Sequence, residues 1–492
     1  MSEELRHGDC RQVLGSLPAE SVNCVVTSPP FWGLRKYTGN QELIWGDNHC
    51  EEHEWGEEIK IPRHHAGETN PGLEAHTKDR GAWSDSGGAF CSRCNAWRGG
   101  LGLEPTPELF ISHLIEILSA IKRVLHPTGV VFWNLDDSRQ NKQLSLIPER
   151  FLIRAQEAGW YVRSKIIWAA SNPMPESATD RPTDAYQLIY MLTKSPRYWY
   201  DQEAVREKYS RDWWNEGWAN RQGFNPKVEA DLEHSLGHSR GGKKKWSESY
   251  SPSGRNLHNI FCFPTQGFFL QMCAKCKRIY EPEQYRRLAE LSRRKVCSCG
   301  SSEWLSHFAT YPEELVRRCL LAGCPPYVCP KFGKPWVRIL EHKLMVIKRS
   351  SRREAMGEDG RTQASGTILE PASAETLGWK ASCSCNLPQS ECVPGTVLDP
   401  FMGSGTTCVV AKKMGRRSIG IDLSEDYIKM AKYRLERTQP ALFPVTEEVI
   451  KGGNHDKQSA TELVLSVQSG GEDSTGEDDS GEEERAAVLF AD

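Results

Sequence analysis

The sequence predicts an α/β fold, with a doubly wound, mostly parallel sheet of the Rossmann-like kind and segments inserted into it. Three observations support this fold class. Apolar, β-branched runs alternate with amphipathic helical stretches. A glycine-rich turn joins an apolar run to a helix at residues 397–407. Paired cysteines lie in stretches that interrupt the alternation. The 492 residues exceed one average domain, so more than one structural unit is expected.

Composition limits the class of protein. The net charge of −3 by itself argues neither for nor against a nucleic-acid partner. No apolar run approaches the length of a membrane span, and the N-terminus lacks an apolar signal core, so we expect no membrane association and a cytoplasmic location. In that compartment the paired members of the 17 cysteines indicate metal ligands before disulfides.

The first half of the chain supplies strands and helices in turn. Residues 5–26 predict a short helix and then a strand. Residues 107–125 have apolar positions at helical spacing and are followed by a predicted turn, HPTG. A buried strand is predicted at 129–135, and a helix at 148–158 begins with proline and ends at Gly159.

Later elements continue the pattern after an interruption. Strands are predicted at 160–170 and 185–195, and residues 203–258 then become polar and irregular. The segments that restore the alternation are a helix at 312–321, a strand, turn and helix at 394–415, and a strand and helix at 416–437. Ser424 is the expected cap of the last helix. After about residue 440 an acidic, low-complexity tail is expected to be disordered.

The stretch VLDPFMGSGTT carries a nucleotide signal. Gly403 and Gly405 lie between an apolar strand and a helix, where the backbone can approach a ligand and the helix offers free N–H groups. Asp422 follows 17 residues after the second glycine, near the distance at which an acid reaches a ribose hydroxyl. A third glycine at dinucleotide spacing and a phosphate-binding lysine are both missing. With Asp399 on the strand, the motif therefore fits a nucleoside without a diphosphate.

The stretch VVTSPPFW poses a second question. Pro29 and Pro30 cannot continue a helix or a sheet ladder, so they end the apolar run and leave a stiff loop. Such a loop can direct fixed hydrogen-bond acceptors at a ligand, with the flat ring of Phe31 beside them.

TSPPF and DPFMGSGTT together resemble the amino-group DNA methyltransferases, which transfer a methyl group from S-adenosylmethionine to an exocyclic base nitrogen. The target loop precedes the cofactor loop, which resembles the β arrangement of that family, and Ser28 is typical of N4-cytosine members, whereas N6-adenine members more often have Asp there. The resemblance is nearest to phage and prophage methylases. It implies a methyltransferase sheet and a location in a bacterial or phage-infected cytoplasm.

The resemblance also implies site residues. The catalytic set is Ser28, Pro29, Pro30 and Phe31. The cofactor-binding set is Asp9, Thr27, His307, Asp399, Pro400, Phe401, Gly403, Gly405, Thr406 and Asp422. An exocyclic amine is a poor nucleophile, so Ser28 Oγ and the Pro29 carbonyl are expected to hold its N–H groups while Phe31 stacks on a base flipped out of the duplex.

Cysteine spacing predicts structural zinc sites with no open coordination position. Two sets are predicted: Cys273, Cys276, Cys297 and Cys299, and Cys50, His53, Cys91 and Cys94. A third set is left open, because Cys329 begins a knuckle whose second cysteine is replaced by Phe332; its partners could be Cys383, Cys385, Cys392 and Cys324. Two or three zinc ions per chain are therefore expected.

The predicted division of the chain separates three catalytic segments by two insertions. The units are a first catalytic segment with the target-base loop (1–48), a zinc-knuckle insertion (49–100), a second catalytic segment (101–205), a target-recognition region with a zinc ribbon (206–305), a third catalytic segment with the cofactor loop (306–440) and the acidic tail (441–492). Lys243–Lys245 and clustered tryptophans favour DNA contact in the recognition region.

The expected function is site-specific methylation of cytosine N4 in double-stranded DNA. A cognate restriction endonuclease is a candidate partner, and the oligomeric state stays open. The rival hypotheses are an N6-adenine methyltransferase of the same fold, a zinc-bearing DNA-binding protein with a decayed methylase domain, and a methyltransferase acting on RNA or protein.

Overall fold

The computed structural model describes most of the chain before the tail. The described residues are 3–33, 41–46, 50–60, 86–140, 142–173, 175–176, 178–207, 254–267, 270–291, 295–305, 311–343, 346–349, 366–370, 373–385 and 387–440. His307, Lys243–Lys245 and the predicted acidic tail lie outside them. None of the helices in the described part of the chain has the length and apolar character that crossing a bilayer requires.

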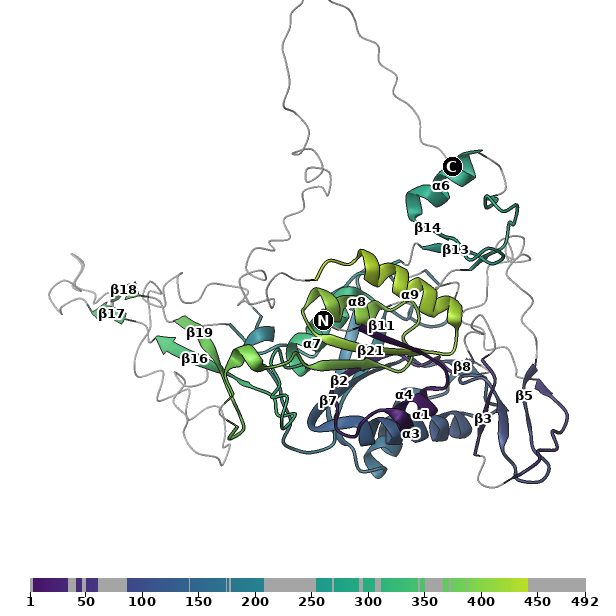
Figure 1. Ribbon diagram of the computed structural model, residues 1–492, viewed down its shortest axis with the longest axis horizontal. Helices are drawn as coiled ribbons and strands as arrows, with labels where there is room; N and C mark the ends of the chain where they lie inside the picture. Colours follow the sequence, from purple (N-terminus) through teal and green to yellow (C-terminus); the bar gives the residue numbers. More distant parts are fainter. Residues whose placement is uncertain are drawn as a thin grey trace, which may run out of the picture. The chain divides into compact units, whose positions relative to one another are not determined.

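An eight-stranded sheet forms the centre of the described part (Figure 1). Its spatial order is β1 (Glu3–His7), β21 (Arg417–Asp422), β20 (Thr396–Asp399), β2 (Val22–Thr27), β7 (Leu125–Leu135), β11 (Tyr186–Thr193), β10 (Tyr161–Ala170) and β12 (Ile260–Phe263). Seven strands run parallel to one another and only β11 is antiparallel to its neighbours. The predicted mostly parallel α/β sheet is confirmed.

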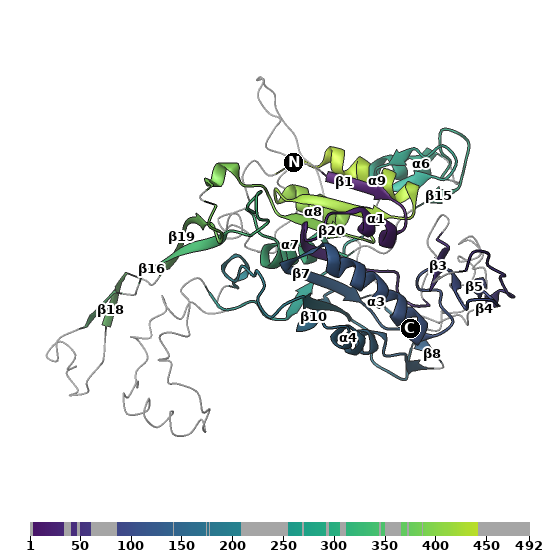
Figure 2. The ribbon, with the colours of Figure 1, turned by 60° about the horizontal axis from the view of Figure 1, so that its bottom comes forward.

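Helices cover both faces of this sheet (Figures 1 and 2). One layer holds α1 (Cys10–Ser16), α3 (Pro107–Val124) and α4 (Ile147–Glu157). The other holds α7 (Glu313–Gly323), α8 (Thr406–Lys413) and α9 (Glu425–Arg437). Because both faces are covered, β2 is buried along its whole length, as expected for a parallel strand between two helical layers.

Local sequence signals explain where these helices begin. Thr106 caps α3 by accepting a hydrogen bond from Leu109 N, with Pro107 as the first helical residue. Ser424 caps α9 as predicted, accepting from Tyr427 N. Beneath the sheet, Trp133 stacks on Phe151 in the largest apolar cluster, at a ring-centroid distance of 5.2 Å.

Three details of the sheet differ from the sequence prediction. The first strand, β1, was not predicted, because its residues carry charges and lie at the sheet edge. The predicted turn HPTG lies within β7, where the pairing with β2 shifts register between Val22 and Cys24. The edge strand β12 falls inside the segment 206–305 that was assigned to target recognition, so this part of the segment belongs to the central sheet.

Smaller sheets lie outside the central sheet (Figure 2). One contains β3 (Leu43–Trp45), β6 (Trp97–Gly99), β5 (Ser86–Phe90) and β4 (Ile59–Lys60), and another contains β14 (Ile279–Tyr280), β13 (Gln271–Cys273) and β15 (Trp304–Leu305) beside α6 (Pro282–Leu291). The pairs are β16 (Val337–Lys343) with β19 (Ser373–Lys380), β17 (Val346–Arg349) with β18 (Gly366–Glu370), and β8 (Arg139–Gln140) with β9 (Gln143–Leu144).

Candidate active site

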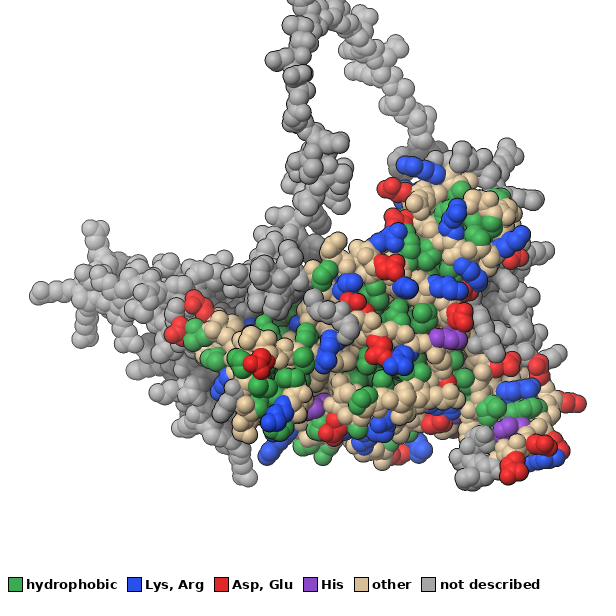
Figure 3. Space-filling model, viewed as in Figure 1, with side chains coloured by type: hydrophobic (Ala, Val, Ile, Leu, Met, Phe, Trp, Pro, Cys, Tyr) green, Lys and Arg blue, Asp and Glu red, His purple; other side chains and the backbone are tan. Residues whose placement is uncertain are grey.

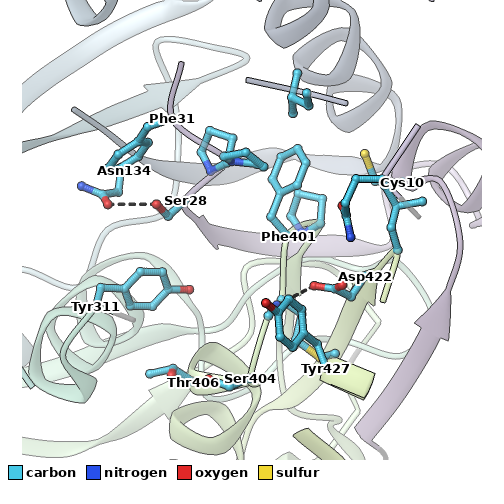
Figure 4. Close-up of a pocket in the computed structure, with 18 of the residues that line it drawn as sticks. Cys10, Ser28, Phe31, Asn134, Tyr311, Phe401, Ser404, Thr406, Asp422 and Tyr427 are labelled. Atoms are coloured by element: carbon cyan, nitrogen blue, oxygen red, sulfur yellow. Dashed lines mark hydrogen bonds between the residues drawn. The ribbon is translucent and has the colours of Figure 1, made fainter. Parts of the chain in front are cut away.

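A pocket of about 490 Å³ opens at the carboxyl ends of the central strands, and Figure 4 shows part of its lining. The loop after β2 forms one wall and the loop after β20 forms the other. These two strands are neighbours, yet the chain leaves β20 through α8 on one face and leaves β2 toward α3 on the other. Open α/β sheets bind ligands at such a switch point, and the volume suits a small organic ligand.

Ser28 lies at the pocket wall with its hydroxyl already oriented. Its Oγ donates to Asn134 Oδ1 at 3.1 Å, the contact drawn in Figure 4. Asn134 is only 3% exposed, and its Nδ2 donates to the carbonyl oxygen of Leu188 at 3.1 Å, which identifies Oδ1 as the acceptor facing Ser28. Since the hydroxyl proton is committed to Asn134, the oxygen lone pairs of Ser28 are left to accept N–H groups from a ligand.

Contacts with residues 102–104 hold the proline loop in place. Trp32 is 1% exposed, and its indole N–H donates to the Glu104 carbonyl at 2.9 Å. Gly102 has φ +87°, and a Cβ there would lie 2.9 Å from the Phe31 carbonyl oxygen, so only glycine allows this approach. The Gly33 amide donates to the Gly102 carbonyl at 2.8 Å. These contacts therefore hold the backbone of residues 28–31 in one position at the pocket wall.

The opposite wall is the glycine loop, held by Asp422 at the end of β21. The Gly403 amide donates to Asp422 Oδ2 at 2.8 Å, and the Ser424 amide donates to Oδ1 at 2.7 Å. Burial raises the pKa of Asp422 to about 6 against the lowering effect of these two amides. Each carboxylate oxygen retains a lone pair for a ligand hydroxyl.

Asp399 lies beneath the pocket and joins several elements by hydrogen bonds. It is fully buried, and its oxygens accept from Thr27 Oγ1 at 2.7 Å, Tyr311 OH at 2.9 Å and the Phe401 amide at 3.1 Å. Burial raises the pKa of this carboxyl above its usual range. Asp399 thus ties β2, β20 and the segment before α7 together beneath the pocket.

The remaining predicted site residues divide into two groups. Those that line the pocket are Ser28, Pro29, Pro30, Phe31, Pro400, Phe401, Gly403, Thr406 and Asp422. Those that do not line it are Asp9, Thr27, Asp399 and Gly405, and His307 lies outside the described residues. Cofactor contact by these four residues stays a prediction from the resemblance. Asp9, for example, caps α1 and pairs with Arg11 at 2.7 Å.

Several pocket residues were not singled out from the sequence. Asn134, Asp136 and Gln187 line it from the ends of β7 and β11, and Tyr427 lines it from α9. Burial raises the pKa of Asp136 to about 7. The available signal was the rule that polar residues at the carboxyl end of a parallel strand lie at the ligand edge. It applies to residue 134, near the end of the predicted strand, and to residue 136, directly after it.

The two predicted cysteine clusters each converge on a point. Cys273 Sγ lies 3.5 Å from Cys299 Sγ, and Cys276 Sγ lies 3.4 Å from Cys297 Sγ. In the other cluster Cys94 Sγ lies 3.5 Å from His53 Nδ1, beside Cys50 and Cys91. Within each group all four ligand atoms lie within 4.8 Å of one another, a spacing that could hold one metal ion.

Comparison with known proteins gives one family. Residues 22–327 and 388–433 match the sequence profile of a family described as DNA methylase, which is more than two thirds of the chain. The chain is 24% identical over 461 residues to the type II methyltransferase M.Cfr9I of Citrobacter freundii, covering 88% of this chain and 87% of that protein.

Another relative and a solved structure align with most of the chain. The type II methyltransferase M.SmaI of Serratia marcescens is 24% identical over 440 residues, with 87% and 89% of the two chains covered. The structure of the PvuII DNA methyltransferase (cytosine-N4-specific) aligns with a TM-score of 0.42 at 13% identity, covering 92% of this chain and 90% of that one.

Proposed function

The chain belongs to the DNA methylase family, and from its pocket we propose that it transfers a methyl group from S-adenosylmethionine to the exocyclic N4 of a flipped cytosine in double-stranded DNA. The observation that carries this proposal is the placement of the Ser28–Phe31 loop opposite the glycine loop in one pocket, with the Ser28 hydroxyl proton held by Asn134.

The target amine would be held by the proline loop. Ser28 Oγ and the Pro29 carbonyl are acceptors for its two N–H groups, which leaves the nitrogen lone pair directed out of the base plane. Phe31 offers a ring on which the flipped base can stack. Because Asn134 fixes the hydroxyl before the base arrives, the acceptor needs little reorganisation during methyl transfer.

The opposite wall fits an adenosyl group. Asp422 has acceptor capacity for ribose hydroxyls, and Phe401 and Tyr427 supply flat apolar surface for a purine. The Gly403 backbone comes close to this surface without a side chain in the way. S-adenosylmethionine would supply an electrophilic methyl group, and the chain's task is to hold donor and amine in line.

The two four-ligand clusters would bind structural zinc, because all their ligands are Cys or His in short turns. The module of β13, β14, β15 and α6 packs against α9 through Met272 and Tyr427, so its zinc would support one pocket wall. Figure 3 shows lysine and arginine side chains, intermixed with acidic ones, around this module. We assign it to contact with the DNA backbone.

The rival functions differ in what they need from the site. A decayed methylase domain would not require an oriented Ser28 or a ligand-ready Asp422, and the chain keeps both. An N6-adenine activity requires the same amine geometry, so Ser28 is what favours cytosine here. A cognate restriction endonuclease as partner, and a bacterial or phage-infected cytoplasm as location, complete the proposal.

Transfer of tritiated methyl groups tests the substrate class. Purified protein is incubated with labelled S-adenosylmethionine and plasmid DNA, total RNA or a protein extract in parallel. Label should enter the DNA alone, and Ser28→Ala should reduce its rate of entry about 10²- to 10³-fold. Preferential labelling of RNA or protein would overturn the proposal.

A further inference from the structure

A third group of cysteines lies where a segment without a counterpart in the DNA methylase profile leaves the fold. Residues 328–387 separate the two matched parts of the chain, and they contain the ribbon of β16 and β19. Cys329 lies at the start of this insertion, Cys383 and Cys385 lie near its end, and Cys392 follows its last residue by five positions. The cluster therefore joins both ends of the insertion.

Three of these sulfurs are already in contact. Cys329 Sγ lies 3.4 Å from Cys385 Sγ, and Cys383 Sγ lies 3.0 Å from Cys385 Sγ. Sulfurs around a tetrahedral zinc ion, each about 2.3 Å from the metal, are about 3.8 Å apart. The three atoms thus need only small shifts to surround an ion, and all lie within 4.8 Å of one another.

Cys392 is next to this group. Val328 pairs antiparallel with Val393 through hydrogen bonds of 2.8 and 3.1 Å, and this register places Cys392 opposite Cys329. The short helical turn Gln389–Glu391 delivers it to the cluster just before β20. Three thiols thus lie within 4.8 Å of one another, and a fourth cysteine lies opposite Cys329 in the backbone pairing.

The backbone at Cys329 repeats the turn of the two predicted zinc clusters. At Cys91 and at Cys273 the amide of the fourth following residue donates to the cysteine carbonyl, at 2.9 and 3.0 Å. The cysteine amide donates to the fifth residue's carbonyl, at 2.8 and 2.9 Å. The fourth residues, Asn95 and Lys277, adopt positive φ of 61° and 58° although neither is glycine. In both turns the third residue after the cysteine is a second ligand.

Cys329 makes the same two hydrogen bonds, each at 2.9 Å, and its fourth residue, Gly333, has φ 66°. The third residue is Phe332, whose side chain is 49% exposed and cannot ligate. The turn is therefore a zinc knuckle with one ligand missing, and Cys392, opposite Cys329 in the backbone pairing, is the candidate for the replacement ligand.

We propose that Cys329, Cys383, Cys385 and Cys392 bind a third structural zinc ion, which clasps the base of the inserted ribbon to the methylase fold. Four thiolates with no open position suit zinc. The site lies before β20, at the opposite end of that strand from the pocket, so it supports the insertion rather than the chemistry.

The surroundings show what such a clasp would hold. Val328 bridges to both Pro335 and Val393, which brings the two ends of the insertion together. Arg338 on β16 pairs with buried Asp201 at 2.8 Å and stacks over Trp379 of β19, 4.8 Å from the ring centroid. The base of the β16–β19 ribbon therefore packs on the methylase fold. The zinc ion would hold together the loop before β16 and the loop after β19.

Metal analysis of the full-length protein tests the proposal. Zinc per chain is measured by mass spectrometry for the wild type, for Cys383→Ser/Cys385→Ser, and for Cys262→Ser, an exposed cysteine outside all three clusters. We expect one zinc ion fewer in the double variant than in the other two proteins. Equal zinc content in all three proteins would overturn the proposal. So would iron in the wild type that is lost from the double variant while the zinc content stays the same.

A rescue experiment keeps the test decisive if the double variant folds poorly. Cys392→Ser should lose the same ion, and adding Phe332→Cys should restore it by completing the knuckle at Cys329. Limited proteolysis should cut the ribbon faster in Cys392→Ser and at the wild-type rate in the rescued protein. Zinc loss without rescue would contradict the knuckle assignment. These readouts do not depend on methylation, so they stand or fall separately from the proposed function.

Discussion

The hydroxyl of Ser28 can act either as donor or as acceptor, and its neighbour determines which. Asn134 Oδ1 accepts a hydrogen bond from the Ser28 hydroxyl, and the Leu188 carbonyl accepts one from the Asn134 amide nitrogen. The two hydrogen bonds therefore have one consistent direction. A group that must hold an amine N–H needs this direction, because an outward-pointing hydroxyl proton would repel the amine.

Ser28→Ala should lower kcat about 10²- to 10³-fold, because one preorganised acceptor is lost from the transition state. Affinity for S-adenosylmethionine should stay within twofold, since the other pocket wall is untouched. Steady-state kinetics and calorimetry measure the two effects. Ser16→Ala, at the exposed end of α1, is the matched control and should retain full activity. Wild-type turnover in Ser28→Ala would refute the role of this residue.

Cofactor affinity should depend on pH through Asp422. Its pKa is raised to about 6 in the free protein, and only the ionised carboxylate can accept from two ribose hydroxyls. Affinity should therefore rise with pH, and binding at pH 5 should be about tenfold weaker than at pH 7.5. Calorimetric titrations across this range provide the measurement. Asp422→Asn should bind more weakly at pH 7.5 and lose the pH dependence; an unchanged slope in that variant would assign the dependence to another group.

Burial explains which site residues the sequence could predict. The loops around Ser28 and Gly403 have local motifs, and both line the pocket. Asp399 belongs to the same motif as Gly403 but is fully buried among its hydrogen-bond partners. Nothing in the sequence distinguishes a motif residue that lines the pocket from one that is buried beneath it. Asn134 is 106 residues from Ser28, so only the folded sheet could reveal their contact.

At the level of elements, the glycine loop depends on the close approach of two helices. Gly405 begins α8 with φ +82°, and a Cβ there would lie 2.7 Å from Ala431 Cβ on α9. The turn that shapes the pocket and the packing of α8 on α9 therefore share one residue.

Gly405→Ala should destabilise the protein by at least ~1 kcal/mol, from the left-handed backbone alone, with the contact to Ala431 adding to the cost. Gly15→Ala in α1 is the matched control: nothing lies within 4 Å of its Cβ, so it should be neutral or stabilising by up to ~1 kcal/mol. Urea denaturation compares the two variants. Equal stability of both would show that α8 and α9 can separate without cost.

Elements with their own sequence pattern were predictable, and edge strands were not. The helices α3, α4, α7 and α9 follow apolar spacing and capping residues, and their predicted positions are confirmed. By contrast, β1 and β12 pair on only one side of the sheet and are short, so tertiary pairing rather than local composition places them.

At the scale of the whole molecule, an inserted module is coupled to the methylase fold. The cluster around Cys273 lies in a module that packs on α9, where Lys277 pairs with Asp426 at 2.6 Å. Met272 of the same module shares an apolar cluster with Tyr427, which lines the pocket.

Cys276→Ser/Cys299→Ser should therefore lose one zinc ion and weaken binding of S-adenosylmethionine severalfold, because α9 loses its support. Metal analysis and calorimetry on the same sample check both effects. Cys392→Ser is the comparison, since its cluster lies before β20, away from the pocket, and should leave cofactor affinity unchanged. Equal affinity in both variants would show that the module around Cys273 does not support the pocket.

Identification of the methylated nucleoside tests the central claim most directly. Plasmid DNA incubated with the purified protein and S-adenosylmethionine is digested to nucleosides and analysed by mass spectrometry, with Ser28→Ala as the comparison. We predict N4-methylcytosine in the wild-type reaction and about 10²- to 10³-fold less in the Ser28→Ala reaction over the same initial period. N6-methyladenine in its place would contradict the assignment of cytosine to Ser28, and no methylated nucleoside from an active preparation that binds the cofactor would contradict DNA methylation itself.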